Sequence, residues 1–137
     1  MSFSKIKSYA KINLALNITG KTSSLHKIES IVSFVNLFDD ILIKRVKSNN
    51  HNVSFSGKFS KNIQKENTVT KLLNLLDKDE LLKGKKFQIK INKRIPNKAG
   101  LGGGSMNAAN ILRYFVNKKI IVISKKKIKI ISRLIGS

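Results

Sequence analysis

The sequence predicts an α+β domain, because strand-like segments fill its first half and helix-like segments follow, mixed with further strands. Apolar residues at every second position indicate the strands, and apolar stripes spaced three or four residues apart indicate the helices. The 137 residues contain no internal repeat and no low-complexity linker, and this length suits one domain with a modest core. The order of elements argues against a doubly wound parallel sheet.

Alternation is clearest in the first predicted strand, which covers residues 5–18. Its apolar face holds isoleucine, leucine and alanine side chains, and Lys11 and Asn13 fall on the opposite, polar face. Gly20 and the polar stretch 22–24 then indicate a loop, because they interrupt the alternation with residues that favour turns.

Two apolar strands are predicted after this loop, at 31–38 and 41–46. Asp39 and Asp40 are expected to form the turn between them, because aspartate is common in turns and rare inside strands. A polar turn after the second of these strands leads into the middle of the chain. Shorter strands are expected at 53–56 and 87–91.

Three helices are predicted from apolar stripes and from residues that cap helix starts. Asn67 is expected to cap the first, the second follows a glycine-rich loop after Pro96, and Ser124 is expected to cap the third. Their apolar stripes are Val69, Leu72, Leu73 and Leu76; Ala108, Ile111, Leu112 and Phe115; and Ile128, Ile131, Leu134 and Ile135.

The formal net charge of +21 raises the question of a nucleic-acid partner. Two observations argue against it. Lysine far outnumbers arginine, although the planar arginine side chain is the usual reader of bases and phosphates. The lysines are also spread along the whole chain, and isoleucine and asparagine are enriched with them, as an A/T-rich genome would produce.

Several classes of site and location are excluded by composition. The chain has no cysteine, so it has no disulfide and no thiolate metal site. His26 and His51 lie far apart without nearby carboxylates, which argues against a histidine metal centre. The first residues lack the apolar segment of a signal peptide, and no apolar run reaches membrane-spanning length. We expect a soluble cytoplasmic protein without a membrane partner.

The most informative segment is 96–109, which holds four glycines within five residues at 100–104. Glycines let the backbone approach a ligand closely, and successive N–H groups in such a loop can bind an anion. A helix that begins next to the loop adds its positive dipole end. The segment therefore predicts a phosphate site, although its spacing fits neither the P-loop nor the dinucleotide fingerprint.

This segment resembles the second signature motif of the galactokinase–homoserine–mevalonate–phosphomevalonate (GHMP) kinases, which bind the phosphates of ATP there. Four further segments match the family in order, at 9–14, 25–26, 66–69 and 134–137. Together they resemble the branch that phosphorylates the 2-hydroxyl of a cytidine-diphosphate-linked methylerythritol in the non-mevalonate isoprenoid pathway. The implied ATP- and phosphate-binding residues are Pro96, Asn97, Lys98, Ala99, Gly100, Leu101, Gly102, Gly103, Gly104, Ser105 and Met106.

The resemblance also implies roles for single residues outside the loop. Lys11 would be catalytic, because a lysine there can stabilise charge on the transferring phosphoryl group and orient the acceptor hydroxyl. Asn13 and His26 would bind the acceptor. Ser105 would reach a phosphate or a magnesium ion. The implied cofactors are ATP and Mg²⁺, and the implied partner is a small molecule rather than a nucleic acid.

Three residues depart from the family pattern. Tyr9 replaces a proline, and Met106 replaces a second serine, so that one hydroxyl near the phosphates is lost. Leu25 replaces an aromatic residue that stacks on the cytosine in the family. Another small-molecule acceptor therefore stays open as an alternative. A basic RNA-binding module on the same scaffold and a non-catalytic remnant that binds nucleotide are the others.

The end of the sequence departs most from the family pattern. In the family an aspartate follows the segment matched by 136–137 and acts with the lysine, and a carboxy-terminal domain completes the site. We therefore expect residues 1–137 to form an incomplete GHMP amino-terminal ATP-binding domain, similar to the second domain of ribosomal protein S5 and inactive alone. A short paralogue, a premature stop and an incomplete gene model all fit.

Overall fold

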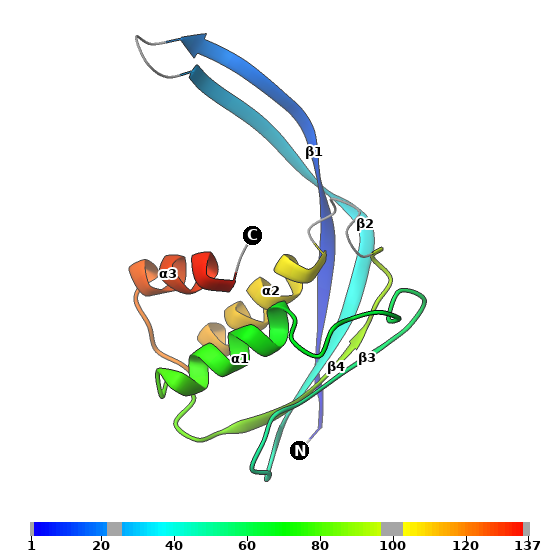
Figure 1. The fold of residues 1–137 in the computed structure, drawn as a ribbon, viewed down its shortest axis with the longest axis vertical. Helices are drawn as coiled ribbons and strands as arrows, with labels where there is room; N and C mark the ends of the chain where they lie inside the picture. Colours follow the sequence, from blue (N-terminus) through cyan, green and yellow to red (C-terminus); the bar gives the residue numbers. More distant parts are fainter. Residues whose placement is uncertain (1, 22–25, 97–102, 136–137) are drawn as a thin grey trace.

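The computed structural model describes residues 2–21, 26–96 and 103–135. Within them one four-stranded sheet and three helices form two layers (Figure 1). The helices lie on one face of the sheet, and the core fills the space between the layers. The outer half of the first two strands projects beyond the helices as a long hairpin. The predicted α+β class is therefore confirmed.

The sheet has the strand order β1-β2-β4-β3. β1 (Ser4–Lys21) pairs antiparallel with β2 (His26–Val46), which pairs antiparallel with β4 (Lys86–Asn92) on its other side. β3 (Asn52–Ser56) pairs parallel with β4, because the helix between them in the chain returns it to the same end of the sheet. Both short strands predicted from the sequence are confirmed.

β2 runs without a break through Asp39 and Asp40, so the predicted turn is wrong and the two predicted strands are one. Asp39 pairs with Ser8 of β1, and its side chain is fully buried. Aspartate favours turns because its carboxylate bonds to nearby backbone N–H groups. Here the carboxylate accepts hydrogen bonds from residues distant in sequence, including the backbone N–H of Arg94, and this pairing overrides the local preference.

The alternation predicted along β1 holds near its start. Ser8 and Ala10 are buried on the helix side, and Lys5 and Lys7 are exposed. Beyond residue 9 the pairing register with β2 shifts at three places. Each extra residue in a strand displaces the alternation of faces. The continuous period of two predicted for 5–18 therefore does not fix the register of this hairpin.

The three helices occur in the predicted order. α2 starts inside the glycine-rich segment rather than after it, so its first three residues, Gly103, Gly104 and Ser105, are small. No helix in the described part of the chain combines the length and apolar character needed to cross a membrane. The bounds are Thr68–Lys78 for α1, Gly103–Asn117 for α2 and Lys125–Ile135 for α3.

Two helix starts carry the caps that the sequence predicts. The Asn67 side chain accepts hydrogen bonds from the backbone N–H groups of Val69 and Thr70, at 3.0 and 3.1 Å. The Thr70 hydroxyl returns the bond by accepting from the N–H of Asn67 at 2.8 Å. At the start of α3, the Ser124 hydroxyl accepts from the N–H of Lys127 at 3.1 Å. These bonds satisfy N–H groups that have no partner inside their helices.

The core takes one stripe from each helix and alternate residues from β2 and β4. Leu134 departs from the predicted stripe of α3, because it is 64% exposed whereas Ile131 and Ile135 are buried. At about 100° per residue, Leu134 lies roughly 90° from the centre of the stripe formed by Ile128 and these two residues. The largest fully buried side chains are Phe115, Ile41, Ile43, Leu72, Leu73, Leu76, Leu82, Ile89, Ile91, Ile95, Ile111 and Ile121.

Phe115→Ala should lower the free energy of unfolding by about 3–5 kcal/mol, because it leaves a cavity where a buried ring contacts Phe87. Urea unfolding followed by circular dichroism measures the loss. Val122→Ala is the control, since Val122 is 86% exposed and its truncation should change stability by less than about 0.5 kcal/mol. Equal losses in the two variants would contradict this core.

Candidate functional site

The start of α2 is the described part of the predicted phosphate site. Its first turn carries no acidic side chain. The first N–H groups of a helix have no partner within it, and the helix dipole is positive at this end, so the turn can bind an anion. Of the predicted loop residues, the structure describes Pro96, Gly103, Gly104, Ser105 and Met106, whereas Asn97, Lys98, Ala99, Gly100, Leu101 and Gly102 lie outside the described residues.

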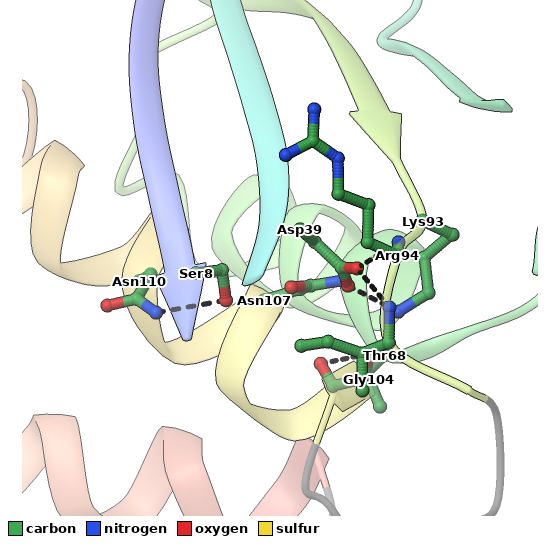
Figure 2. Close-up of polar contacts among 9 residues, drawn as sticks. Ser8, Asp39, Thr68, Lys93, Arg94, Gly104, Asn107 and Asn110 are labelled. Carbon is green, nitrogen blue, oxygen red and sulfur yellow. Dashed lines mark hydrogen bonds and ion pairs between the residues drawn. The ribbon is translucent and has the colours of Figure 1, made fainter. Parts of the chain in front are cut away.

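The starts of α1 and α2 lie side by side (Figure 2). Thr68, the first residue of α1, donates a hydrogen bond from its hydroxyl to the carbonyl oxygen of Gly104 at 2.8 Å. A Cβ on Gly104 would lie 3.4 Å from Thr68 Oγ1, so a glycine leaves room for this contact. Two positive helix ends therefore meet where the glycine-rich segment enters α2.

A buried carboxylate lies behind these helix starts. Asp39 of β2 is ion-paired with the ammonium group of Lys93, and both side chains are almost completely buried. Its other oxygen accepts from the backbone N–H groups of Arg94 and Ile95, at 2.7 and 2.9 Å. The side-chain amide of Asn107 in α2 donates to Asp39 Oδ2 at 3.0 Å (Figure 2). Four donors therefore converge on one carboxylate.

These donors come from both sides of the glycine-rich segment. Residues 93–95 lead into it from β4, and Asn107 follows it in α2. Asp39 therefore joins both flanks of the candidate phosphate site to the centre of the sheet. Sequence reasoning missed this group because Asp39 was assigned to a turn, and no local pattern marks partners that lie 54 to 68 residues away.

Two more polar contacts place α2 on β1. The side-chain amide of Asn110 donates to Ser8 Oγ at 3.1 Å, and the hydroxyl of Tyr114 donates to Ser4 Oγ at 3.0 Å. Residue numbers rise along α2 while they fall along β1, so the two elements run in opposite directions. The start of α2 is thus directed toward the part of β1 beyond Ser8, where Lys11 lies.

Lys11 is half-buried in β1, opposite Phe34 of β2. It makes no ion pair with any residue that the structure describes, so its charge is not neutralised by a described carboxylate. Asn13 lies two residues further along the same strand and pairs with Val32. The structure therefore places Lys11 and Asn13 in neighbouring positions of the strand that approaches the start of α2.

His26 lies at the far end of the hairpin, where it begins β2 and pairs with Lys21. Eight residues of β2 separate it from Phe34, the partner of Lys11, which corresponds to roughly 26 Å at about 3.3 Å per residue. The structure does not bring His26 next to Lys11. Leu25, the departure from the family pattern beside it, lies outside the described residues.

A cleft of about 910 Å³ runs along α1 between this helix, β3 and the segment that joins them. One end reaches Asn67, next to the residue that contacts Gly104. At the other end, His51 Nδ1 accepts from the backbone N–H of Phe87 at 3.0 Å, and Nε2 lies 2.9 Å from Asp77. Since Nδ1 is an acceptor, the proton of neutral His51 lies on Nε2 and is donated to Asp77. Both ring nitrogens therefore have partners. The ring links α1 to β4 through these two contacts and is not free to act as a base.

Metal ligands are scarce in the described part of the chain, where no three histidine or acidic residues gather into a group that could hold a metal ion. Asp39, the carboxylate behind the helix starts, is fully buried and already accepts from four donors. Magnesium prefers to keep several waters and to bind phosphate oxygens with one or two protein ligands. A magnesium ion at this site would therefore have to take most of its ligands from a triphosphate and from water, and the role of the Ser105 hydroxyl as a ligand stays a prediction.

Comparison with known families identifies the chain. Residues 67–136 match the family model described as GHMP kinases N terminal domain. The chain belongs to the GHMP kinases. The matched residues include the cap of α1, all of α2 and all of α3, so the match covers both helix starts at the candidate phosphate site.

Curated relatives match almost the whole length of this chain. A 4-diphosphocytidyl-2-C-methyl-D-erythritol kinase from Pelagibacter ubique is 58% identical over 137 residues, which are 100% of this chain and 49% of the relative. The kinase of the same name from Finegoldia magna is 34% identical over 134 residues, covering 97% of this chain and 48% of the relative. The chain thus spans about half the length of the curated relatives it matches.

Solved structures share the fold. A crystal structure of 4-(cytidine 5'-diphospho)-2C-methyl-D-erythritol kinase matches with a TM-score of 0.71 and 24% identity, over 98% of this chain and 46% of that one. Homoserine kinase from Cytophaga hutchinsonii matches with a TM-score of 0.66 and 13% identity, over 96% of this chain and 40% of that one. These likenesses confirm the predicted GHMP amino-terminal fold.

Gly57→Ala should destabilise the framework of the site more than Gly84→Ala. Both glycines have positive φ, which costs a residue with a Cβ about 1–2 kcal/mol. At Gly57 the added Cβ would also meet Asn92 Oδ1 and the backbone oxygen of Lys93, at 2.2 and 2.8 Å, whereas nothing lies within 4 Å at Gly84. Thermal unfolding should show about 1–3 kcal/mol of additional loss for Gly57→Ala. Equal losses would refute close packing against Lys93.

Proposed function

We propose that this chain is the nucleotide-binding part of a cytoplasmic kinase that transfers the γ-phosphoryl group of ATP to the 2-hydroxyl of 4-diphosphocytidyl-2-C-methyl-D-erythritol. The observation that carries the proposal is the start of α2, a glycine-built helix end without acidic side chains that lies beside a second helix start. The names of the relatives, which match 100% and 97% of the chain, support the acceptor. The cytoplasm is proposed because the reaction consumes ATP.

Phosphoryl transfer depends mainly on positioning and on stabilising charge. In the proposed reaction, residues 96–106 hold the phosphates of ATP, and Lys11 stabilises the negative charge that moves toward the acceptor. Two observations support this role. Lys11 makes no ion pair with a described residue, and it lies three residues along β1 from Ser8, which contacts α2. Magnesium bound with the triphosphate would neutralise further charge. The cleft that ends at Asn67 offers room for the nucleoside of ATP.

The proposed acceptor is extended, with its reacting hydroxyl at one end and its cytidine at the other. Asn13 is close to Lys11 along β1, and His26 is far from it along the hairpin. In the proposal Asn13 contacts the polyol and His26 the cytidine. An extended acceptor suits this spacing better than a compact one. Because Leu25 offers no aromatic face for the cytosine, a GHMP kinase with a different acceptor is the second candidate.

The proposal is tested by a phosphotransfer assay on the complete polypeptide that carries this chain, with ATP, Mg²⁺ and 4-diphosphocytidyl-2-C-methyl-D-erythritol. We expect ADP and phosphorylated acceptor in equal amounts. Mevalonate and homoserine, offered in parallel, test the second candidate. Turnover of another acceptor alone would favour that candidate, and salt-sensitive RNA binding without any ATP binding would reject a kinase.

Lys11→Met should lower kcat by roughly 10²–10³-fold, the loss typical when one charge-stabilising group is removed from an active site. Steady-state kinetics with saturating ATP measures the loss. Lys5→Met is the matched control, because Lys5 lies on the same strand with its side chain 61% exposed, and its activity should stay within about twofold. Equal activity in the two variants would exclude Lys11 from the chemistry.

Gly104→Ala should separate stability from nucleotide binding. The added Cβ would lie 3.4 Å from Thr68 Oγ1, and alanine favours the helix by roughly 1 kcal/mol over glycine, so the fold should be retained. A phosphate that approaches the backbone at this position would nevertheless be obstructed. We expect unchanged or higher thermal stability with at least about tenfold weaker ATP binding by calorimetry. Unchanged ATP affinity would remove Gly104 from the phosphate site.

A further inference from the structure

A line of polar contacts crosses the otherwise apolar interface between α2 and the sheet. Asn107, Asn110 and Tyr114 lie on one face of α2, at spacings of three and four residues. Asn107 contacts Asp39 at 3.0 Å and Asn110 contacts Ser8 at 3.1 Å (Figure 2). Tyr114 contacts Ser4 at 3.0 Å. Ser8 and Asp39 are themselves paired across β1 and β2. We call these six residues the polar seam.

We infer that the polar seam sets the axial position of α2, and that Asp39 and Asn107 are thereby positioning residues for the nucleotide. The inference rests on the proposed binding of ATP phosphates at the start of α2. Apolar packing is non-directional and tolerates small sliding movements of a helix. Hydrogen bonds between buried side chains have one good geometry, so they select a single register.

Even a small movement of α2 along its axis would matter for the proposed nucleotide site. A slide of α2 by one residue would displace its start by about 1.5 Å. Misplacement of reacting groups by about 1 Å can cost 10²-fold in rate. Asp39 is the decisive member because it also accepts from the N–H groups of Arg94 and Ile95, and so fixes the entry to the glycine-rich segment relative to its exit.

The side-chain amide of Asn107 supports this interpretation. The side chain is 1% exposed, its Nδ2 donates to Asp39, and its Oδ1 has no partner among the described residues. An unpaired buried oxygen carries a desolvation cost, and leucine has nearly the same shape without it. Asparagine at this position is therefore explained by its single bond to Asp39 and not by packing.

Asn107→Leu is the first test, in the complete polypeptide. It removes the contact to α2 and leaves the Asp39–Lys93 pair intact. We expect a folded protein whose Kd and KM for ATP rise at least tenfold, with the KM for the acceptor unchanged. Asn117→Leu, the same substitution at the exposed last residue of α2, should change neither value. Unchanged ATP constants in Asn107→Leu, or equal changes for both substrates, would overturn the inference.

Ser8→Ala/Asn110→Leu removes the next contact of the seam from both sides, so it leaves no unpaired buried group. This double variant replaces Asn107→Leu as the test if Asn107→Leu does not fold. It should also raise the Kd for ATP. Retained wild-type affinity in a folded double variant would contradict the seam as the determinant of register.

Hydrogen exchange gives a measurement that does not depend on ATP. Asn107→Leu should increase exchange at the backbone N–H groups of 93–95 and of 107–110, the first that bond within α2, while the core strand β4 stays protected. If the wild-type protein fails to bind ATP but this exchange pattern appears, the proposed function fails and the positioning of the two flanks stands. If exchange is unchanged, the positioning role is wrong whatever the protein binds.

Asp39→Asn and Lys93→Met together give a rescue test. Asp39→Asn alone leaves a buried ammonium group without a counter-charge, and it should unfold the protein. In the double variant, the amide oxygen introduced at position 39 can still accept from both backbone N–H groups. The Asn107 amide can turn so that its unpaired oxygen accepts from the new amide. We expect recovery of folding and of ATP affinity to within about fivefold. A folded double variant that binds no ATP would show that the charge itself is required and would refute simple positioning.

Discussion

The buried carboxylate of Asp39 is the constraint on which the rest of the structure depends. An ionised carboxylate without partners would be far too costly in the core, so the fold must bring donors to it. One ammonium group, two backbone N–H groups and one side-chain amide fulfil this requirement. They come from the segment that follows β4 and from α2, so satisfying one charge holds the sheet and both flanks of the glycine-rich segment together.

Features that depend on neighbours in sequence were predictable. The apolar stripes of α1 and α2, the Asn67 cap and the glycine-rich entry to α2 all follow from residues within a few positions of each other. The turn predicted at Asp39 failed because its partners lie more than fifty residues away. The prediction that Leu134 lies in the buried stripe of α3 failed for a geometric reason. Its position on the helix places it at the margin of the stripe rather than inside it.

The candidate site, too, was predictable from the sequence only in part. The resemblance to GHMP kinases predicted a phosphate segment and a catalytic role for Lys11 from local motifs. It gave no information about how α2 lies on β1, which depends on Asn110 and Tyr114 meeting two serines of the first strand. Nor did it show how far the hairpin separates His26 from Lys11, because strand length and register shifts set that spacing and neither is written in the motif.

Charge and geometry would contribute differently to the proposed binding of an anion by this chain. A net charge of +21 attracts any anion, but salt screens that attraction beyond about 10 Å at 0.1 M, and the lysines are spread along the whole sequence. The helix N–H groups act only at contact and only on a ligand that fits between the two helix starts. In the proposed site, global charge would therefore promote encounter with an anion, and discrimination among anions would come from the fixed position of α2. That position depends on a few buried polar contacts, and a chain as rich in lysine as this one would otherwise bind phosphates without selecting among them.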